Sequence, residues 1–118
     1  MFIDEAIEEV SFKVYLSDKS NANSLSDNRI SRLVQDHQDN IWVGTKQGGL
    51  NKFDPKTEIF KHHKQSRSVR ESLNSNEISD IYEDVSGVLW VGTQRGGLSK
   101  LNLENKKVAH YRYNYFDP

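Results

Sequence analysis

The sequence predicts an all-β fold, a segment of a β-propeller, from three observations. Residues 24–65 and 72–113 repeat one another at a constant offset of 48 residues without a gap, with 15 identities in 42 aligned positions. Each copy contains four short runs with strand-like patterns, separated by turn residues. Neither copy shows the period of an amphipathic helix. Four short antiparallel strands in a repeat of this length make one propeller blade, whereas a coil of a β-helix would be shorter and contain fewer turns.

The two inner strands of each blade follow from their apolar patterns. We expect the innermost strands at 30–36 and 78–84, because both runs mix β-branched and apolar residues and stop at Asp. Short turns rich in residues that tolerate positive φ come next. The second strands are expected at 41–45 and 89–93, where the alternation places each Trp on the face opposite to its apolar neighbours.

A tight hairpin is expected after each second strand. Gly48 and Gly96 are predicted to supply the left-handed conformation that a type I turn with a bulge requires. A long polar loop, 64–76, then connects the first blade to the second. The outer strands of the two blades are expected at 50–53, 59–63, 98–101 and 107–111.

The repeat also extends toward the N-terminus. Phe12-Lys13 lies 48 residues before the same dipeptide at 60–61, so residues 10–16 are predicted to be the last strand of a preceding blade. We therefore expect the chain to begin within a repeat. The predicted domains are 1–23 as the tail of that blade with a linker, followed by blades at 24–71 and 72–118.

Composition excludes several classes of function. A net charge of −1 and a pI near 6.4 give no general attraction to nucleic acid or anionic lipid. No apolar run approaches the roughly 18–20 residues that span a bilayer, and the acidic N-terminus lacks the pattern of a signal peptide. The chain has no cysteine, so disulfides and thiolate metal sites are excluded. We expect neither nucleic-acid binding nor direct membrane insertion.

The order of motifs in both repeats closely resembles the two-component regulator propeller repeat. That order is Leu-Ser-x-Asn-x-Ile, then Asp, then Ile/Leu-Trp-Val-Gly-Thr-x-x-Gly-Gly-Leu, then Phe-Asp-Pro-Lys-Thr. WD-type signatures are missing, and kelch blades place their Trp after the double glycine. The second repeat departs from the pattern in its last turn, 102–105, which affects the expected geometry of that turn alone. The positions that carry the motif, and that we assign a structural role, are Trp42, Gly44, Gly48, Gly49, Trp90, Gly92, Gly96 and Gly97.

The resemblance implies a sensor module of bacterial signal transduction. Such propellers usually lie outside the cytoplasmic membrane, in the periplasm, ahead of a transmembrane helix. Their output modules are histidine kinases, hybrid kinases with a response-regulator part, or diguanylate cyclases, and none of these is present in the 118 residues. We therefore expect a non-enzymatic, ligand-sensing segment of a two-component-type receptor. Two alternatives remain open: a protein-interaction scaffold and, third, a lyase of the propeller type.

Several motifs that could carry chemistry are better explained by structure. The Gly44-Thr45-x-x-Gly48-Gly49 string looks like a phosphate-binding loop, but a strand follows it rather than a helix N-terminus. The oxygen ligands at Asp36, Gln38 and Asn40 have calcium-loop spacing, yet no Glu closes the loop. His62 and His63 are adjacent on a strand and so point to opposite faces. We predict no metal, no cofactor and no catalytic residues.

If the chain binds a ligand, we expect the site on the loops, because loops on a rigid scaffold carry function in propellers. Charged and amide side chains recur at the two hairpin tips, and a local basic stretch lies in the loop between the blades. These side chains would line one rim of a ring and bind a small molecule or an oligosaccharide. The candidate residues are Lys46, Gln47, Gln94, Arg95, Arg67 and Arg70.

Two blades alone are expected to leave an apolar face uncovered at each end. We predict that Trp42, Ile81 and Tyr82 contribute to these faces and pack on a neighbour. Repeat arrays need roughly three units to bury a continuous core, and each Å² of apolar surface buried contributes about 25 cal/mol. The expected partners are further blades of a parent chain or other copies of this one. Three copies of two blades would close a ring of six in a homo-oligomer, by the head-to-tail route.

Overall fold

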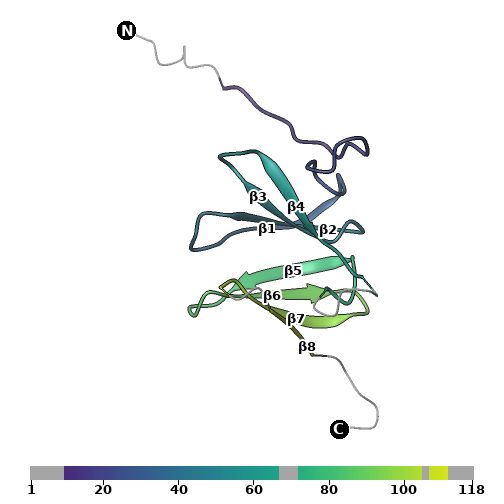
Figure 1. The fold of residues 1–118 in the computed structure, drawn as a ribbon, viewed down its shortest axis with the longest axis vertical. Helices are drawn as coiled ribbons and strands as arrows, with labels where there is room; N and C mark the ends of the chain where they lie inside the picture. Colours follow the sequence, from purple (N-terminus) through teal and green to yellow (C-terminus); the bar gives the residue numbers. More distant parts are fainter. Residues whose placement is uncertain (1–9, 67–71, 105–106, 112–118) are drawn as a thin grey trace.

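The computed structural model describes residues 10–66, 72–104 and 107–111, and within these it is built from two four-stranded antiparallel sheets. Each sheet follows chain order, so every strand pairs with its neighbour in sequence (Figure 1). The first blade contains β1 (Ile30–Gln35), β2 (Ile41–Thr45), β3 (Leu50–Asp54) and β4 (Ile59–His63). The second contains β5 (Ile78–Glu83), β6 (Val88–Thr93), β7 (Gly97–Asn102) and β8 (Val108–Tyr111).

The eight predicted strands are confirmed, with ends that differ by at most one residue. Both inner strands stop one residue before their Asp, because Asp36 and Asp84 belong to the turns that follow. The predicted strand at 10–16 is not formed. That segment leads outward from the first blade (Figure 1) and pairs with neither sheet within the described residues.

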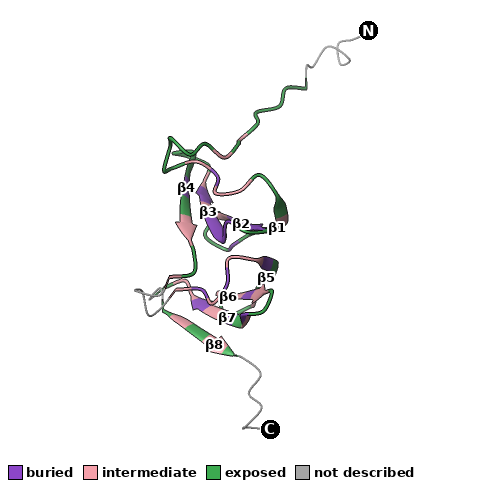
Figure 2. Ribbon diagram, turned by 90° about the vertical axis from the view of Figure 1, so that its right-hand side faces the viewer, coloured by how far each residue is buried: buried purple, intermediate pink, exposed green. Residues whose placement is uncertain are grey.

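The two blades pack face to face through a mainly apolar core. Trp42 and Leu50 of the first blade lie in one cluster with Ile81, Leu89 and Val91 of the second, all of them almost completely buried. Figure 2 shows burial concentrated on β2 and β3 of the first blade and greater exposure on β1 and β8. Complete burial of an aliphatic side chain contributes about 1.5–3 kcal/mol, so this cluster is the main attraction between the blades.

Contact between the inner strands is close at Gly44. A Cβ at this position would lie 2.6 Å from Cγ2 of Ile78 in the second blade, so only glycine leaves room for the neighbouring strand. The equivalent glycine of the second blade, Gly92, would place a Cβ no closer than 3.3 Å to Oγ of Ser79. The crowding at Gly44 therefore comes from the second blade. Gly92 has no following blade beside it within the chain, so it is less crowded.

Two ion pairs join the inner parts of the blades. Arg32 Nε lies 3.0 Å from Asp80 Oδ1, and His37 Nδ1 lies 2.5 Å from Glu83 Oε2. The backbone N–H of His37 also donates to Glu83, at 3.2 Å. The hydrogen bond to Glu83 raises the pKa of His37, and burial acts in the opposite direction without cancelling it. The repeat did not reveal these pairs, because each pair joins two blades and its residues are not conserved between the copies: Asp80 stands at the position of Arg32, and Gln35 at the position of Glu83.

The outer face of the first blade carries a second, smaller cluster. It contains Leu25, Val43, Phe53 and Phe60, with Tyr15 packed against it. The Tyr15 ring meets Phe53 edge-on at 5.0 Å between centroids. The N-terminal segment thus covers part of this face.

The prediction for the uncovered end faces is wrong for two of its three residues. Trp42 and Ile81 are each only 2% exposed, because the two blades bury them against one another. Tyr82 is 63% exposed on the far face of the second blade, as predicted. Trp90 lies on that same face and is half-buried, although its sequence motif is that of Trp42.

Candidate functional site

The hairpins between the second and third strands form one end of both blades. The side chain of Thr45 closes the first of them: its Oγ1 donates to the carbonyl of Gly49 at 2.7 Å and accepts from the N–H of Gly48 at 2.9 Å. Thr93 makes the matching bond to the carbonyl of Gly97, at 2.8 Å. Thr in the repeated Trp-Val-Gly-Thr string therefore fixes the turn that follows it.

The two glycines of each hairpin have different roles, and the sequence prediction assigned one of them to the wrong residue. Positive φ occurs at Gly49 and Gly97, with values of 81° and 78°, and not at Gly48 or Gly96. Gly48 is needed for space instead. A Cβ there would lie 2.5 Å from Ser26 Oγ, in the loop that leads into β1. The double glycine thus combines a left-handed residue with a close approach to a neighbouring loop.

The turns at the other end of the blades are closed by aspartate. Asp36 Oδ2 accepts a hydrogen bond from Trp42 Nε1 at 2.7 Å, while Oδ1 accepts from the backbone N–H groups of Gln38 and Asn40 at 2.8 and 2.9 Å. Asp84 accepts in the same way from Trp90, at 2.9 Å, and the hydrogen bond from this indole lowers the pKa of Asp84. The calcium-like spacing at Asp36 is therefore that of a hydrogen-bonded turn. No group of three acidic or histidine side chains suited to a metal occurs in the part of the chain that the structure describes.

The adjacent histidines point to opposite faces, as expected. His62 Nε2 lies 2.5 Å from the carbonyl of Ser24, and the ring of His63 packs on Trp42 with centroids 5.5 Å apart. His110, which repeats His62, has Nδ1 3.0 Å from the hydroxyl of Ser99. Each has a partner in its own blade or the adjoining loop.

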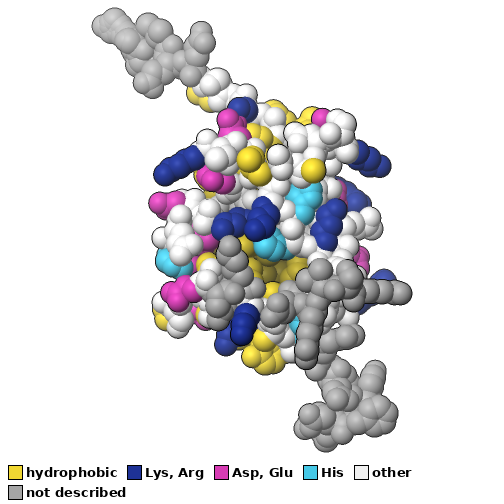
Figure 3. Space-filling view, viewed as in Figure 1, with side chains coloured by type: hydrophobic (Ala, Val, Ile, Leu, Met, Phe, Trp, Pro, Cys, Tyr) yellow, Lys and Arg dark blue, Asp and Glu magenta, His cyan; other side chains and the backbone are white. Residues whose placement is uncertain are grey.

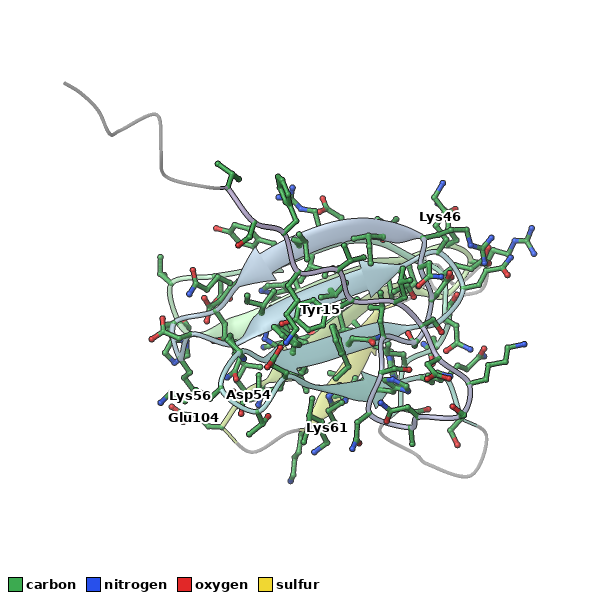
Figure 4. All side chains as sticks on the ribbon, turned by 90° about the horizontal axis from the view of Figure 1, so that it is seen from above. Tyr15, Lys46, Asp54, Lys56, Lys61 and Glu104 are labelled. Atoms are coloured by element: carbon green, nitrogen blue, oxygen red, sulfur yellow. The ribbon has the colours of Figure 1, made fainter. Side chains whose placement is uncertain are left out.

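The structure brings two of the six predicted ligand residues together. Lys46 and Gln94, at the tips of the two hairpins, line one open hollow between the blades. Figure 4 shows Lys46 at the hairpin end and Asp54, Lys56 and Glu104 at the opposite end. The hollow measures about 360 Å³, and its other lining residues are Ser31, Glu77, Ile78 and Ser79.

The hollow offers both donors and acceptors to a ligand. Its charged groups are the exposed ammonium of Lys46 and the carboxylate of Glu77, and its neutral groups include the Gln94 amide. The Ser31 hydroxyl is buried and has no hydrogen-bond partner among the described residues. Leaving a buried polar group unpaired costs about 1–3 kcal/mol, so this hydroxyl is a position where a ligand atom would be stabilised. Sequence reasoning missed Ser31, because nothing in the repeat marks its burial.

The other predicted ligand residues are placed differently. Gln47 is held by its own blade: its N–H donates to Asp27 Oδ2 at 3.0 Å and its amide oxygen accepts from Arg29 at 3.1 Å. Burial acts to raise the pKa of Asp27, but the hydrogen bonds from Arg29 and from the N–H of Gln47 together outweigh it and lower the pKa. Arg95 is exposed at the second hairpin tip, with a φ of 68°. Arg67 and Arg70 lie outside the described residues.

A second depression, of about 100 Å³, lies between the outer strands of the two blades. Figure 3 shows hydrophobic side chains between the blades with lysine and histidine around them. Trp42, Leu101, Leu103 and Val108 supply its apolar lining, and Lys52, Lys61, His63 and Asn102 supply its polar lining. None of the four predicted ligand residues that the structure describes lines this depression.

Comparison with known proteins supports the same architecture. Residues 24–47 and 72–95 match the family described as "Two component regulator propeller". No protein with a curated description matches the chain. Among the described residues, no helix has the length and apolar character needed to cross a membrane.

Two solved structures from B. thetaiotaomicron are similar to the chain. One is the extracellular domain assigned to the hybrid two component system BT3049, with 30% identity over 87% of this chain and a TM-score of 0.73. The other, the extracellular domain assigned to the hybrid two component system BT4673, shares the fold, with 24% identity over 80% of this chain and a TM-score of 0.63. The chain spans only 14% and 12% of the lengths of those two proteins. With the motif in both blades and the fold of the neighbours in agreement, the chain belongs to the two-component regulator propeller family.

Proposed function

We propose that the chain is a non-enzymatic, ligand-sensing propeller segment of an extracytoplasmic, periplasmic receptor in two-component signal transduction. The similar proteins are extracellular domains assigned to hybrid two component systems, which supports both the location and the signalling role. The ligand is a small polar molecule, either an oligosaccharide or an organic anion. It binds at the hairpin end of the blades.

The hollow between the hairpins carries this proposal. It is lined by residues of both blades, so a ligand bound there would bridge them and respond to their relative position. The Lys46 ammonium suits a carboxylate or sulfate group, since charge-assisted hydrogen bonds are the stronger ones. The Ser31 hydroxyl and the Glu77 carboxylate suit the hydroxyl groups of a sugar.

A protein-interaction scaffold is the second candidate. The exposed apolar side chains on the outer faces of both blades favour it, because surfaces of this kind mark protein contacts. The two functions differ in where a small molecule would act: a scaffold needs no ligand at the hairpin end.

Amide NMR shifts of the 118-residue chain test the site directly. The probes are a panel of neutral and sulfated disaccharides together with citrate. We expect at least one probe to give saturable shifts at Ser31, Lys46, Ser79 and Gln94, which line the hollow.

Lys46→Met should weaken binding of that probe about tenfold, the equivalent of about 1.4 kcal/mol. Lys56→Met is the matched control at the opposite end of the blades (Figure 4) and should leave binding unchanged. Equal losses in the two variants would show nonspecific charge attraction. Shifts confined to the outer blade faces, or absent for every probe, would contradict the ligand site and favour the scaffold.

A further inference from the structure

The segment from Val10 to Leu16 has the side-chain pattern of a strand but no strand partner among the described residues. Phe12 and Val14 are 87% and 72% exposed, and Val10 and Leu16 are also exposed. The alternate residues face the first blade: Lys13 and Tyr15 both hydrogen bond to Glu58, Tyr15 at 2.5 Å. An exposed strand with a free backbone edge is a template for pairing with another chain.

Residues 10–16 occupy the position that the fourth strand of a preceding blade would have next to the first blade. The 48-residue offset relates Tyr15 to His63, and His63 lines the outer contact with Leu101 and Val108 of the next blade. Tyr15 packs on Phe53 and Phe60, with centroids 5.0 and 5.6 Å away, and these are the offset equivalents of Leu101 and Val108. Tyr15 therefore contacts the first blade as His63 contacts the second.

The two end faces of the chain match each other in the same way. On the first blade Leu33 is 60% exposed, whereas its equivalent Ile81 is 2% exposed in the contact between the blades. On the second blade the exposed Tyr82 and the half-buried Trp90 are equivalent to Val34 and Trp42, which pack in that contact. We call the exposed face of the first blade, with Leu33, the near face, and the exposed face of the second blade, with Tyr82, the far face. The far face of one chain can therefore pack on the near face of another, as the two blades pack within a chain.

The charges permit the same contact between chains. Within the chain, Arg32 pairs with Asp80, and these residues are offset equivalents of each other. Between chains the equivalent contact would place Asp80 beside the next chain's Arg32, again with opposite charges. Positive and negative side chains would then alternate at this position from one blade to the next.

Such a contact between chains requires that one strand be displaced from its sheet. β8 of one chain and residues 12–15 of the next would occupy the same place, because both stand at the position of β4 in the repeat. Phe-Lys-Val-Tyr at 12–15 aligns with Val-Ala-His-Tyr at 108–111, and the two segments share the final Tyr and an apolar first residue. The aligned pair Phe12 and Val108 differ in size, and Val108 borders the depression of about 100 Å³ between the blades. A phenylalanine ring there would fill space that Val108 leaves open, and filled space favours the exchanged strand.

We propose that residues 10–16 of one chain replace β8 of a second copy as the fourth strand of its second blade. The second blade of that copy then packs its Tyr82 and Trp90 face on the Leu33 and Val43 face of the first chain. Repetition of this contact joins chains head to tail, and a ring closes when the rotation allows.

Disulfide trapping tests the exchange cleanly, because the chain has no cysteine. β7 and β8 pair Lys100 with Ala109, so the exchanged strand would place Lys13 of another chain opposite Lys100. Directly opposite residues have Cβ atoms about 4.5–5.5 Å apart, close to disulfide range. We expect the K13C/K100C chain to form covalent dimers and larger species on oxidation, reversible by reductant. The control K19C/K100C, with a cysteine beyond the segment, should not.

A second variant pins β8 in its own sheet. In K100C/A109C the disulfide forms within one chain, so the oxidised protein should be a 13.6 kDa monomer by light scattering and the reduced protein an oligomer. The proposal is overturned if the unmodified chain is a folded monomer throughout the micromolar range. It is equally overturned if the oxidised and reduced forms of K100C/A109C associate to the same extent, or if K19C/K100C crosslinks as readily as K13C/K100C.

Discussion

Asp36 is the residue on which one turn and one tryptophan both depend. Its carboxylate is buried and accepts three hydrogen bonds, two from the turn backbone and one from the Trp42 indole. Trp42 in turn lies at the centre of the contact between the blades. A polar contact of one residue thus positions the largest apolar side chain of the core.

Asp36→Asn should destabilise the fold by about 1–3 kcal/mol, because an amide NH₂ cannot accept a bond and one buried donor loses its partner. The free energy of unfolding in urea measures the change. Asp39→Asn is the matched control, since Asp39 is exposed in the same turn and Asn tolerates its positive φ of 66°. Equal unfolding midpoints for the two variants would contradict the role of Asp36.

His37 makes the contact between the blades dependent on pH. Its pKa is raised in the folded chain, chiefly by the hydrogen bond to Glu83, with smaller contributions from the Asp36 and Glu104 charges. A raised folded pKa means that the contribution to stability is complete below the unfolded pKa and is lost as pH rises through the folded pKa. Stability should therefore fall as pH rises from the ordinary value of 6.5 toward the raised one.

Glu83→Gln should lower the pKa of His37 toward 6.5 and flatten this dependence. The pKa is measured from the chemical shift of the His37 ring protons, and the stability from thermal unfolding at a series of pH values. Glu58→Gln removes a carboxylate that pairs with Lys13, away from His37, and should change neither the pKa of His37 nor the dependence of stability on pH above 6.5. An unchanged His37 titration in Glu83→Gln would exclude the ion pair.

At the scale of the element, the hairpin between β2 and β3 depends on one glycine for its conformation. Gly49 has a φ of 81°, and a Cβ there would lie 2.6 Å from the carbonyl oxygen of His63, a backbone atom. Gly49→Ala should therefore cost at least about 1–2 kcal/mol, the usual penalty for a left-handed residue, with the clash in addition. Thermal unfolding followed by circular dichroism measures the loss. Lys46→Ala in the same turn is the control and should have little effect on the melting temperature. Equal melting temperatures for Gly49→Ala and Lys46→Ala would contradict the requirement for a left-handed residue at Gly49.

The strands were predictable because the repeat gives each pattern twice. Alternation of apolar residues and the turn residues between them act locally, so both sets of four strands follow from the sequence to within one residue. The choice between Gly48 and Gly49 was not predictable in this way. Both are glycine in each repeat, and only the loop at Ser26 and the carbonyl of His63 distinguish their roles.

The candidate site was predictable only in part. Lys46 and Gln94 stand at equivalent hairpin tips, and the repeat places such tips at one end of the blades. Ser31 was missed because its burial depends on the packing of one blade against the next. The same reason separates Trp42 from Trp90: the motif is identical, but only the first has a blade covering it within the chain.

At the scale of the whole molecule, the proposed head-to-tail contact predicts complementation between two defective variants. Leu33→Glu places a charge on the near face, and Tyr82→Glu places one on the far face. Both positions are exposed within the chain, so each variant should fold but fail to associate with itself. In a mixture, the Leu33→Glu chain keeps an intact far face and the Tyr82→Glu chain keeps an intact near face. It should therefore form a heterodimer that cannot grow, detectable by sedimentation velocity. Self-association of either variant at the level of the unmodified chain, or a mixture that remains monomeric, would contradict the arrangement.

The placement of polar contacts has a consequence for how such a protein can evolve. The aspartate that holds each tryptophan and the threonine that closes each hairpin lie in the same blade as their partners. Contacts between the blades are mostly apolar and tolerate exchange of one hydrophobic residue for another. Duplication of a 48-residue gene segment would therefore deliver a blade with its own turns already satisfied. A longer array can arise by copying, and most of its new contacts are between apolar side chains of suitable size.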